Sequence, residues 1–266
     1  MHVIHGGRGT VMTQRRFTNK TALVTGGGTG IGRATALAFA REGARVVIGN
    51  RSVERGEETV AQIKKLGGTA VFRRTDVTVA ADVAALVALA VEQFGRLDCA
   101  FNNAGTMTSL SPIEDQSEHD FDRVMDTNVK GVWLSMKYEI KQMLAQGGGA
   151  IVNNASVAGI TGSGRGAAHY SASKHAVLGL TKSAGLENAR RNIRVNAVAP
   201  YVTETDMGTQ FAADLKITMA DFAKGNPSGR VGTLADTANA VLWLCSDESS
   251  FVTAHTLAVD GGFTAQ

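Results

Sequence analysis

Residues 21–32 read TALVTGGGTGIG, a short apolar run that leads directly into a glycine-rich turn, and a helical pattern begins near Arg33. Glycine has no Cβ, so the backbone of such a turn can approach a bound group closely. The free N–H groups at the start of the following helix favour negative charge there. A strand, a glycine turn and a helix in this order are typical of a phosphate-binding loop. The same turn also occurs as a plain tight connection, so the rest of the chain has to separate the two interpretations.

Short apolar runs alternate with longer helical segments from residue 20 to the C-terminus. This alternation indicates repeated strand–helix–strand units, and therefore a parallel sheet. The predicted strands are residues 21–25, 45–49, 70–74, 97–101, 150–154, 193–197 and 256–259. The sequence thus predicts an α/β fold with a doubly wound, seven-stranded parallel sheet and helices on both faces. Its functional crevice is expected at the carboxyl ends of the strands.

The composition restricts the partners of the chain. The 266 residues are 44% hydrophobic and 19% charged, which suits one large α/β domain with a substantial core. The net charge is only +3, without a basic stripe, so we expect no nucleic acid. No apolar run has the length of a membrane span, and we expect no membrane partner. Cys99 and Cys245 form neither a disulfide framework nor a metal-ligand spacing, which favours a cytoplasmic setting and no bound metal.

Two segments differ from the repeating pattern. Residues 1–16 are polar and are expected to lie outside the fold, so that residues 17–266 form a single dinucleotide-binding and catalytic domain. Residues 203–232 contain helical stretches near 207–215 and 218–223 but no strand, and we interpret them as a mobile substrate lid. The alternative is a static surface excursion.

Tyr170 and Lys174 lie four residues apart on a predicted helix, so the phenol and the ammonium project from the same face. A phenol with its ordinary pKa of about 10 exchanges protons poorly near neutral pH. At roughly 5 Å and an effective dielectric of about 20, a cation favours the phenolate by about 3 kcal/mol, or about two pKa units. We therefore expect Lys174 to lower the pKa of Tyr170 and make it a general acid and base. Taken alone, such a pair is usually a plain feature of a helix surface.

A series of motifs in order resembles the short-chain dehydrogenase/reductase family, in its single-domain branch with TGxxxGxG and YxxxK motifs. The motifs are TGGGTGIG at 25–32, DV at 76–77, NNAG at 102–105, DTNVKG at 126–131, NASVAG at 154–159 and YSASK at 170–174. The resemblance covers residues 17–266. It implies a Rossmann-type fold, a nicotinamide cofactor and an oxidoreductase that interconverts a ketone and a secondary alcohol.

The resemblance assigns four catalytic residues. It implies that Tyr170 gives a proton to a carbonyl oxygen during reduction and that Ser156 hydrogen-bonds the same oxygen. Lys174 is expected to hold the nicotinamide ribose, and Asn128 to position a water that links Lys174 to solvent. The expected cofactor-binding residues are Gly26, Thr29, Gly30, Ile31, Gly32, Asn50, Arg51, Asp76, Val77, Asn103, Ala104, Gly105, Tyr170, Lys174, Pro200, Thr203 and Thr205.

The end of the second predicted strand bears on the choice between NADP(H) and NAD(H). An acidic residue there would bind the ribose 2′-hydroxyl of NAD and repel a 2′-phosphate. This chain has the neutral Asn50 followed by the cationic Arg51, whose planar donors suit a phosphate. The sequence favours NADP(H). NAD(H) stays possible if Arg51 is only a solvated residue and Asn50 accepts the ribose.

Two departures from the family pattern fall near the expected substrate pocket. Fourteen positions separate Ser156 from Tyr170, one more than the family usually shows, and Tyr201 replaces the glycine that usually follows Pro200. Tyr201 is expected to narrow the pocket or to turn outward. Candidate substrate contacts, each of which is otherwise a packing residue, are Met107, Ile160, His169, Tyr201, Met207 and Phe211.

The expected reaction is NADP(H)-dependent interconversion of a ketone and a secondary alcohol, with a 3-oxoacyl thioester or a small hydrophobic ketone as the carbonyl substrate. An NAD-dependent secondary-alcohol dehydrogenase is the alternative, and a non-catalytic cofactor-sensing protein is a remote one. The resemblance also implies a homotetramer, with an interface on the predicted helices at 121–144 and 170–190. The sequence leaves substrate, stereochemistry and direction of the reaction open.

Overall fold

The computed structural model describes residues 15–266. Most of the extension expected at residues 1–16 therefore lies outside the described residues. Its last residue contacts the domain: the Arg16 backbone N–H and guanidinium each donate to the Glu42 carboxylate at 3.2 Å, and the following residue, Phe17, is buried. The packed part of the chain thus includes Arg16.

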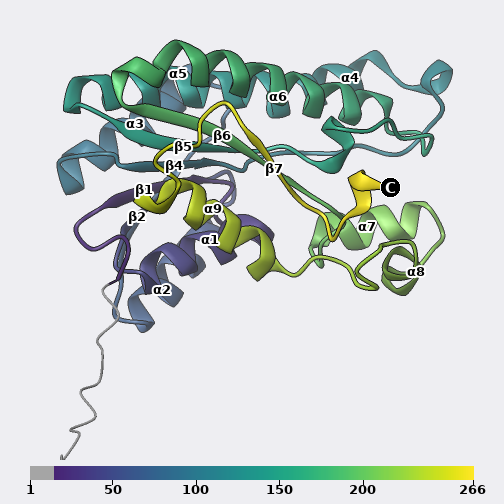
Figure 1. Cartoon of the computed structure of the whole chain (residues 1–266), viewed down its shortest axis with the longest axis horizontal. Helices are drawn as coiled ribbons and strands as arrows, with labels where there is room; N and C mark the ends of the chain where they lie inside the picture. Colours follow the sequence, from purple (N-terminus) through teal and green to yellow (C-terminus); the bar gives the residue numbers. More distant parts are fainter. Residues whose placement is uncertain (1–14) are drawn as a thin grey trace, which may run out of the picture.

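Seven parallel strands form one sheet in the order β3-β2-β1-β4-β5-β6-β7 (Figure 1). The strands are β1 (Thr21–Thr25), β2 (Arg45–Asn50), β3 (Thr69–Arg74), β4 (Cys99–Asn102), β5 (Gly149–Asn154), β6 (Ile193–Pro200) and β7 (Thr256–Val259). The predicted Rossmann-type, doubly wound sheet is confirmed. Because the winding direction changes between β1 and β4, the connections that follow these strands diverge and leave a crevice at their carboxyl ends.

Helices cover both faces of the sheet. The helices α1 (Gly30–Arg41), α2 (Val53–Lys65) and α9 (Leu234–Cys245) lie on one face, and α3 (Ala80–Phe94), α5 (Gly131–Gln146) and α6 (Ala168–Asn188) lie on the other (Figure 1). Shorter elements are α4 (Glu118–Met125), the π-helix η2 (Asp126–Lys130), α7 (Asp206–Asp214) and α8 (Met219–Lys224). Single 3₁₀ turns are η1 (Ile113–Asp115), η3 (Val157–Gly159), η4 (Ala189–Arg191), η5 (Asp247–Ser249) and η6 (Phe263–Ala265).

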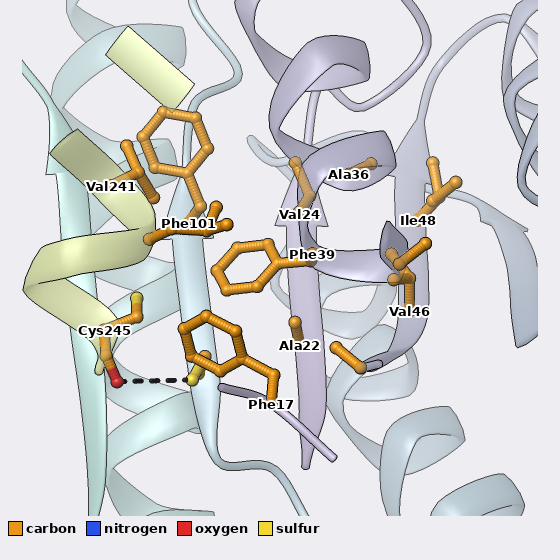
Figure 2. Packing of buried hydrophobic residues seen from close by; sticks show 14 of the residues in the cluster. Phe17, Ala22, Val24, Ala36, Phe39, Val46, Ile48, Phe101, Val241 and Cys245 are labelled. Atoms are coloured by element: carbon orange, nitrogen blue, oxygen red, sulfur yellow. Dashed lines mark hydrogen bonds between the residues drawn. The ribbon is translucent and has the colours of Figure 1, made fainter. Parts of the chain in front are cut away.

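Alternate residues of β1 and β2 enter different cores, as the period of two in a strand requires. Ala22 and Val24 pack with α1 and α9, where the rings of Phe17 and Phe39 meet edge to face at 5.0 Å (Figure 2). Leu23, between them in the chain, packs with the other core under α3, α5 and α6. Burial of both faces explains why these strands read as continuous apolar runs.

The two cysteines are both free, and both are buried in the core between the sheet and the helices α1 and α9. The Cys99 thiol on β4 lies 3.8 Å from the Cys245 carbonyl oxygen at the end of α9 (Figure 2). Within residues 15–266, no cluster of side chains is arranged to hold a metal ion. The same described part of the chain contains no helix that is both long and apolar enough to cross a membrane.

The segment predicted as a lid connects β6 to α9. It contains α7 and α8, which lie together at one end of the molecule beside the C-terminus (Figure 1). A single parallel bridge between Thr203 and Gly232 closes its base. This geometry places the segment over the carboxyl end of β6, where a lid has to be; its movement stays a prediction.

Candidate active site

A groove of about 400 Å³ follows the carboxyl ends of β1, β2 and β4, as expected from the topology. The glycine turn forms one wall. Gly26 and Gly30 have φ angles of +65° and +51°, a region that residues with a Cβ avoid, and a Cβ at Gly26 would lie 2.9 Å from the Ala104 Cα. The turn therefore has to be glycine for the chain to pass this close to the NNAG segment.

The start of α1 lies open at this wall. Thr29 is the N-cap residue of α1, but its side chain accepts no capping hydrogen bond. By contrast, side chains cap α2, α7, α8 and α9. The first N–H groups of α1 are thus left for a ligand, which fits a negatively charged group such as a pyrophosphate.

Most of the predicted cofactor residues line this groove. They are Gly26, Thr29, Gly30, Ile31, Asn50, Arg51, Asp76, Val77, Asn103, Ala104, Gly105, Tyr170, Lys174 and Thr205. Three predicted residues lie elsewhere. Pro200 and Thr203 line a neighbouring cavity. Gly32 does not line the groove, because it packs inside the turn, where a Cβ would overlap the Gly26 carbonyl oxygen. Its contact with a cofactor stays a prediction, while its packing role follows from this close approach.

Two arginines line the groove, and one of them, Arg55, lies 4.0 Å from the Asp206 carboxylate. Arg51 and Arg55 line the groove together with Ser52, the N-cap of α2. Asn50 donates from Nδ2 to the Ser52 carbonyl oxygen at 2.9 Å, so the neutral amide helps to hold this turn. Burial acts to raise the pKa of Asp76, but hydrogen bonds from Thr78 and the charges of Arg51 and Arg74 hold that pKa below its ordinary value. The charge of Arg51 therefore interacts with the Asp76 carboxylate, which lines the same groove.

Asparagine side chains join the strand ends behind the groove. Asn103 donates from Nδ2 to the carbonyl oxygens of Thr25 and Gly26, both at 3.2 Å. Asn154 donates from Nδ2 to Asn103 Oδ1 at 3.0 Å, whereas Asn154 Oδ1 is buried without a partner within residues 15–266. These bonds fix β1, β4 and β5 relative to one another at the place where a ligand would lie.

Tyr170, Lys174 and Ser156 converge where the groove passes into a second cavity. The Lys174 side chain is buried and donates from Nζ to the Asn154 carbonyl oxygen at 2.8 Å. Its Nζ also lies 5.5 Å from the centroid of the Tyr170 ring, and Ser156 lines the second cavity together with Tyr170. Three predicted catalytic residues are thus brought together.

The expected direction of the pKa change at Tyr170 is wrong for the chain by itself. Burial raises the pKa of Tyr170 to about 12, and the nearby Ser156 side chain offsets only part of this. Burial also lowers the pKa of Lys174 to about 8. The physical reason is that Lys174 directs its Nζ to a backbone carbonyl and the ring face, so desolvation of the phenolate outweighs the charge. Tyr170 is held as a neutral phenol.

Asn128 lies in the π-helix η2, a feature that the sequence pattern did not predict. Its side chain is buried, accepts from the Thr106 N–H at 2.8 Å, and donates to the Thr106 carbonyl oxygen at 2.9 Å and to Ser173 Oγ at 3.0 Å. Both amide hydrogens are therefore used within the protein. The side chain fastens the loop after β4 to the catalytic helix α6.

The second cavity, of about 300 Å³, shares Tyr170 with the groove. Four predicted substrate residues line it: Met107, Tyr201, Met207 and Phe211. The Tyr201 ring turns inward, 4.7 Å from the ring of Phe263 and 6.3 Å from that of Phe222. Aromatic rings thus form the wall opposite Ser156 and Tyr170.

Two predicted substrate residues do not line either cavity. Ile160 follows the 3₁₀ turn η3 and is 40% exposed. His169 is buried, with Nε2 2.6 Å from Thr108 Oγ1, and burial lowers its pKa. It connects α6 to the loop after β4. Adjacency to Tyr170 in the chain was a poor guide because neighbours in a helix point about 100° apart.

Several lining residues were missed. They are Ser52, Arg55, Thr75, Asn154, Arg165, Phe222 and Phe263. Ser52 and Arg55 had a signal, since they begin the helix that follows Arg51. Phe222 and Phe263 had none, because they reach the cavity from α8 and from the C-terminal end through tertiary packing.

Known proteins match almost the whole chain. A family model described as enoyl-(acyl carrier protein) reductase matches residues 26–264. Cyclohexanol dehydrogenase from Acinetobacter sp. (strain SE19) is 41% identical over 251 residues, which cover 94% of this chain and 97% of that protein. Levodione reductase from Leifsonia aquatica is 39% identical over 257 residues, with 94% and 96% covered.

Solved structures also match over almost the whole chain. A crystal structure of levodione reductase has a TM-score of 0.91 and 38% identity, and the match covers 94% of this chain and 99% of that one. A structure of NAD⁺-bound xylitol dehydrogenase has a TM-score of 0.87 and 34% identity, with 93% and 100% covered. Likeness at this level extends over the sequence and the fold. The chain therefore belongs to the short-chain dehydrogenase/reductase family of oxidoreductases.

Proposed function

We propose that this protein is an NADP(H)-dependent oxidoreductase that interconverts a small hydrophobic ketone and its secondary alcohol. The observation that carries the proposal is the convergence of Ser156, Tyr170 and Lys174 between a groove suited to a dinucleotide and a cavity with apolar and aromatic walls. The relatives named cyclohexanol dehydrogenase and levodione reductase support the reaction class.

The groove fits a nicotinamide dinucleotide by its chemistry. The open N–H groups of α1 suit the pyrophosphate, and the floor lacks Cβ atoms at Gly26 and Gly30. A bound nicotinamide would supply the hydride chemistry.

The residues of the chain manage the proton and the carbonyl. Tyr170, a neutral phenol, donates its proton to the carbonyl oxygen as charge develops there, and Ser156 donates a second hydrogen bond to that oxygen. Lys174, as an ammonium below its pKa of about 8, stabilises the phenolate left behind. Asn128 acts as a positioning residue that holds the loop after β4. In the reverse direction Tyr170 accepts the proton of an alcohol.

The preference for NADP(H) rests on Arg51. It lines the groove beyond the neutral Asn50, where no carboxylate of the turn opposes a 2′-phosphate. The alternative is an NAD-dependent secondary-alcohol dehydrogenase, in which Asn50 accepts the ribose hydroxyls. If the protein were a non-catalytic sensor, the convergence of Ser156, Tyr170 and Lys174 would have no role.

Two further properties belong to the proposal. Trp133 on α5 and Leu186 on α6 are 47% and 71% exposed, which suits a homotetramer built on these helices. The two free cysteines suit a cytoplasmic setting.

Purified protein with a panel of cyclic and acyclic ketones, 3-oxoacyl thioesters, NADPH and NADH tests the function. We expect ketone-dependent loss of absorbance at 340 nm, faster with NADPH. Cofactor binding without turnover on any ketone or alcohol would contradict the proposed activity, and an equal or greater kcat/KM with NADH would contradict the cofactor preference.

A further inference from the structure

Arg165 is the one charged side chain among the residues that line the substrate cavity. It lies in the glycine-rich loop of residues 162–166, within the lengthened interval between Ser156 and Tyr170. The remaining lining residues are apolar, aromatic, hydroxyl-bearing or amide-bearing, or glycine, and Asp and Glu are not among them. Arg165 is itself exposed to solvent, and the walls of the cavity supply no carboxylate as a counter-charge.

The described chain provides no ion-pair partner for this cation. Within residues 15–266, no carboxylate lies within salt-bridge distance of the Arg165 guanidinium. Its Cζ lies instead 5.6 Å from the centroid of the Phe222 ring on α8, a cation–π contact. Such a contact orients the planar guanidinium but leaves its N–H donors free for a ligand.

The charge of Arg165 reaches into the cavity. Burial raises the pKa of Tyr201, and the positive charge of Arg165 offsets part of that rise. Tyr201 is itself a wall residue, packed against Phe263 and Phe222. The positive charge of Arg165 therefore acts on the aromatic wall of the cavity. Ser156 and Tyr170, which would hold the reacting oxygen, line the same cavity.

We propose that Arg165 selects substrates that carry a carboxylate: a ketone on a compact apolar body, with an anionic group that the guanidinium binds while the ketone oxygen meets Ser156 and Tyr170. This inference rests on the proposed function and specifies its substrate class. The aromatic rings accommodate the apolar body, and a bidentate, charge-assisted contact to the carboxylate fixes its orientation. A neutral ketone would offer the guanidinium no charge-assisted contact.

A matched pair of ketones tests the inference through turnover. We would measure kcat/KM with NADPH for 4-oxocyclohexanecarboxylate and for 4-methylcyclohexanone, in the wild type, Arg165→Met and Arg165→Lys. We expect the wild type to prefer the carboxylate at least tenfold, mainly through KM. Arg165→Met should lower that ratio at least tenfold, and Arg165→Lys should retain part of it. Exposed Arg190, which lines neither cavity, provides the control Arg190→Met, which should keep the wild-type ratio.

A binding measurement separates this inference from the proposed reaction. Calorimetry on the NADPH-loaded protein would compare cyclohexanecarboxylate with cyclohexanecarboxamide. Tighter binding of the carboxylate that is lost in Arg165→Met supports the role of Arg165 even if no ketone is reduced. Turnover of both ketones with no carboxylate preference, or equal losses for both ketones in Arg165→Met, would overturn the inference and leave the reaction standing. Equal binding of acid and amide by the wild type would overturn it as well.

Discussion

Tyr170 and Lys174 show what a four-residue spacing reveals and what it omits. The spacing correctly predicts that both side chains reach one face of α6. It contains no information on burial, and burial is what raises the pKa of Tyr170 to about 12 and lowers that of Lys174 to about 8. The protonated phenol is the form that a reductase needs at the start of its reaction. We therefore interpret Tyr170 as a protonated phenol with the Lys174 cation nearby, rather than as a preformed phenolate.

Arg51→Ala tests the cofactor preference at this scale. We expect the Kd of NADPH to rise about tenfold, which corresponds to about 1.4 kcal/mol, because the exposed guanidinium contributes one charge-assisted contact. The Kd of NADH should change less than threefold. Fluorescence titration of both cofactors measures this. Arg41→Ala, at the exposed end of α1 and away from the groove, is the matched control. Parallel losses for NADPH and NADH would refute the electrostatic argument.

Residues contributed by local motifs were predictable, and residues contributed by tertiary packing were not. The glycine turn and the NNAG segment follow strand ends, so their place at the groove follows from a parallel sheet. Phe263 comes from the C-terminal end, and no spacing in the sequence relates it to Tyr201. His169 illustrates the opposite error, since its position beside Tyr170 in the chain does not bring it to the cavity.

At the scale of elements, the glycine turn and α1 form one closely packed unit with β1 and β4. Gly32 lies in the first turn of α1, and a Cβ there would overlap the Gly26 carbonyl oxygen and lie 2.5 Å from Asn103 Nδ2. A backbone atom cannot move aside as a flexible side chain can. The spacing of these glycines thus serves packing as much as ligand access.

Gly32→Ala should therefore destabilise the protein by about 2 kcal/mol or more and weaken NADPH binding, because α1 has to shift away from the turn. Urea denaturation and cofactor titration measure the two effects. The control is Gly179→Ala, in the exposed middle of α6 with no atom near an added Cβ, which should be neutral or stabilising by up to about 1 kcal/mol. A Gly32→Ala protein as stable as the wild type would show that the close approach has no energetic role.

Element boundaries could be predicted only in part. β1 and β7 begin and end where the apolar runs do, whereas β6 extends to Pro200, three residues beyond the predicted end. The extension follows from pairing with β7, a non-local contact. The π-helix around Asn128 also escaped prediction, because its apolar pattern differs little from that of the α-helices on either side.

At the scale of the whole molecule, a buried polar network joins the central strands to α5 behind the groove. Glu139 is fully buried, and its Oε2 accepts from Asn102 Nδ2 at 3.0 Å. The same Nδ2 also donates to Asn153 Oδ1 at 3.0 Å, and Asn153 Nδ2 donates to Thr181 Oγ1 on α6 at 2.9 Å. The network ties β4 and β5 to α5 and α6 on one face of the sheet, and its one carboxyl group makes it sensitive to pH.

Burial raises the pKa of Glu139 to about 7, and the hydrogen bond from Asn102 opposes this only in part. The folded protein therefore binds this proton more tightly than the unfolded chain does. Its contribution to stability is fully present below the unfolded pKa of 4.5 and is lost as pH rises to about 7. A difference of this size corresponds to roughly 3 kcal/mol.

Glu139→Gln should remove the loss of folding stability that ionisation of Glu139 causes as pH rises. The free energy of unfolding of the variant, relative to the wild type, should increase by about 2 kcal/mol between pH 5 and pH 8, because an amide does not ionise. Urea denaturation at the two pH values measures the change. Glu114→Gln, at an exposed position, should follow the wild type at both. An identical pH dependence in Glu139→Gln and the wild type would show that Glu139 does not titrate in this range.

The reaction itself depends on the phenolic hydroxyl of Tyr170, and its removal is the most direct test. Single-turnover reduction of a ketone would be followed at 340 nm with NADPH-loaded wild type, Tyr170→Phe and the control Tyr138→Phe, a half-buried tyrosine outside the two cavities. We predict a rate 10²- to 10⁴-fold lower, on the order of a lost general acid, in Tyr170→Phe alone, with the Kd of NADPH within about threefold of wild type. A Tyr170→Phe protein that reduces the ketone at nearly the wild-type rate would contradict the mechanism.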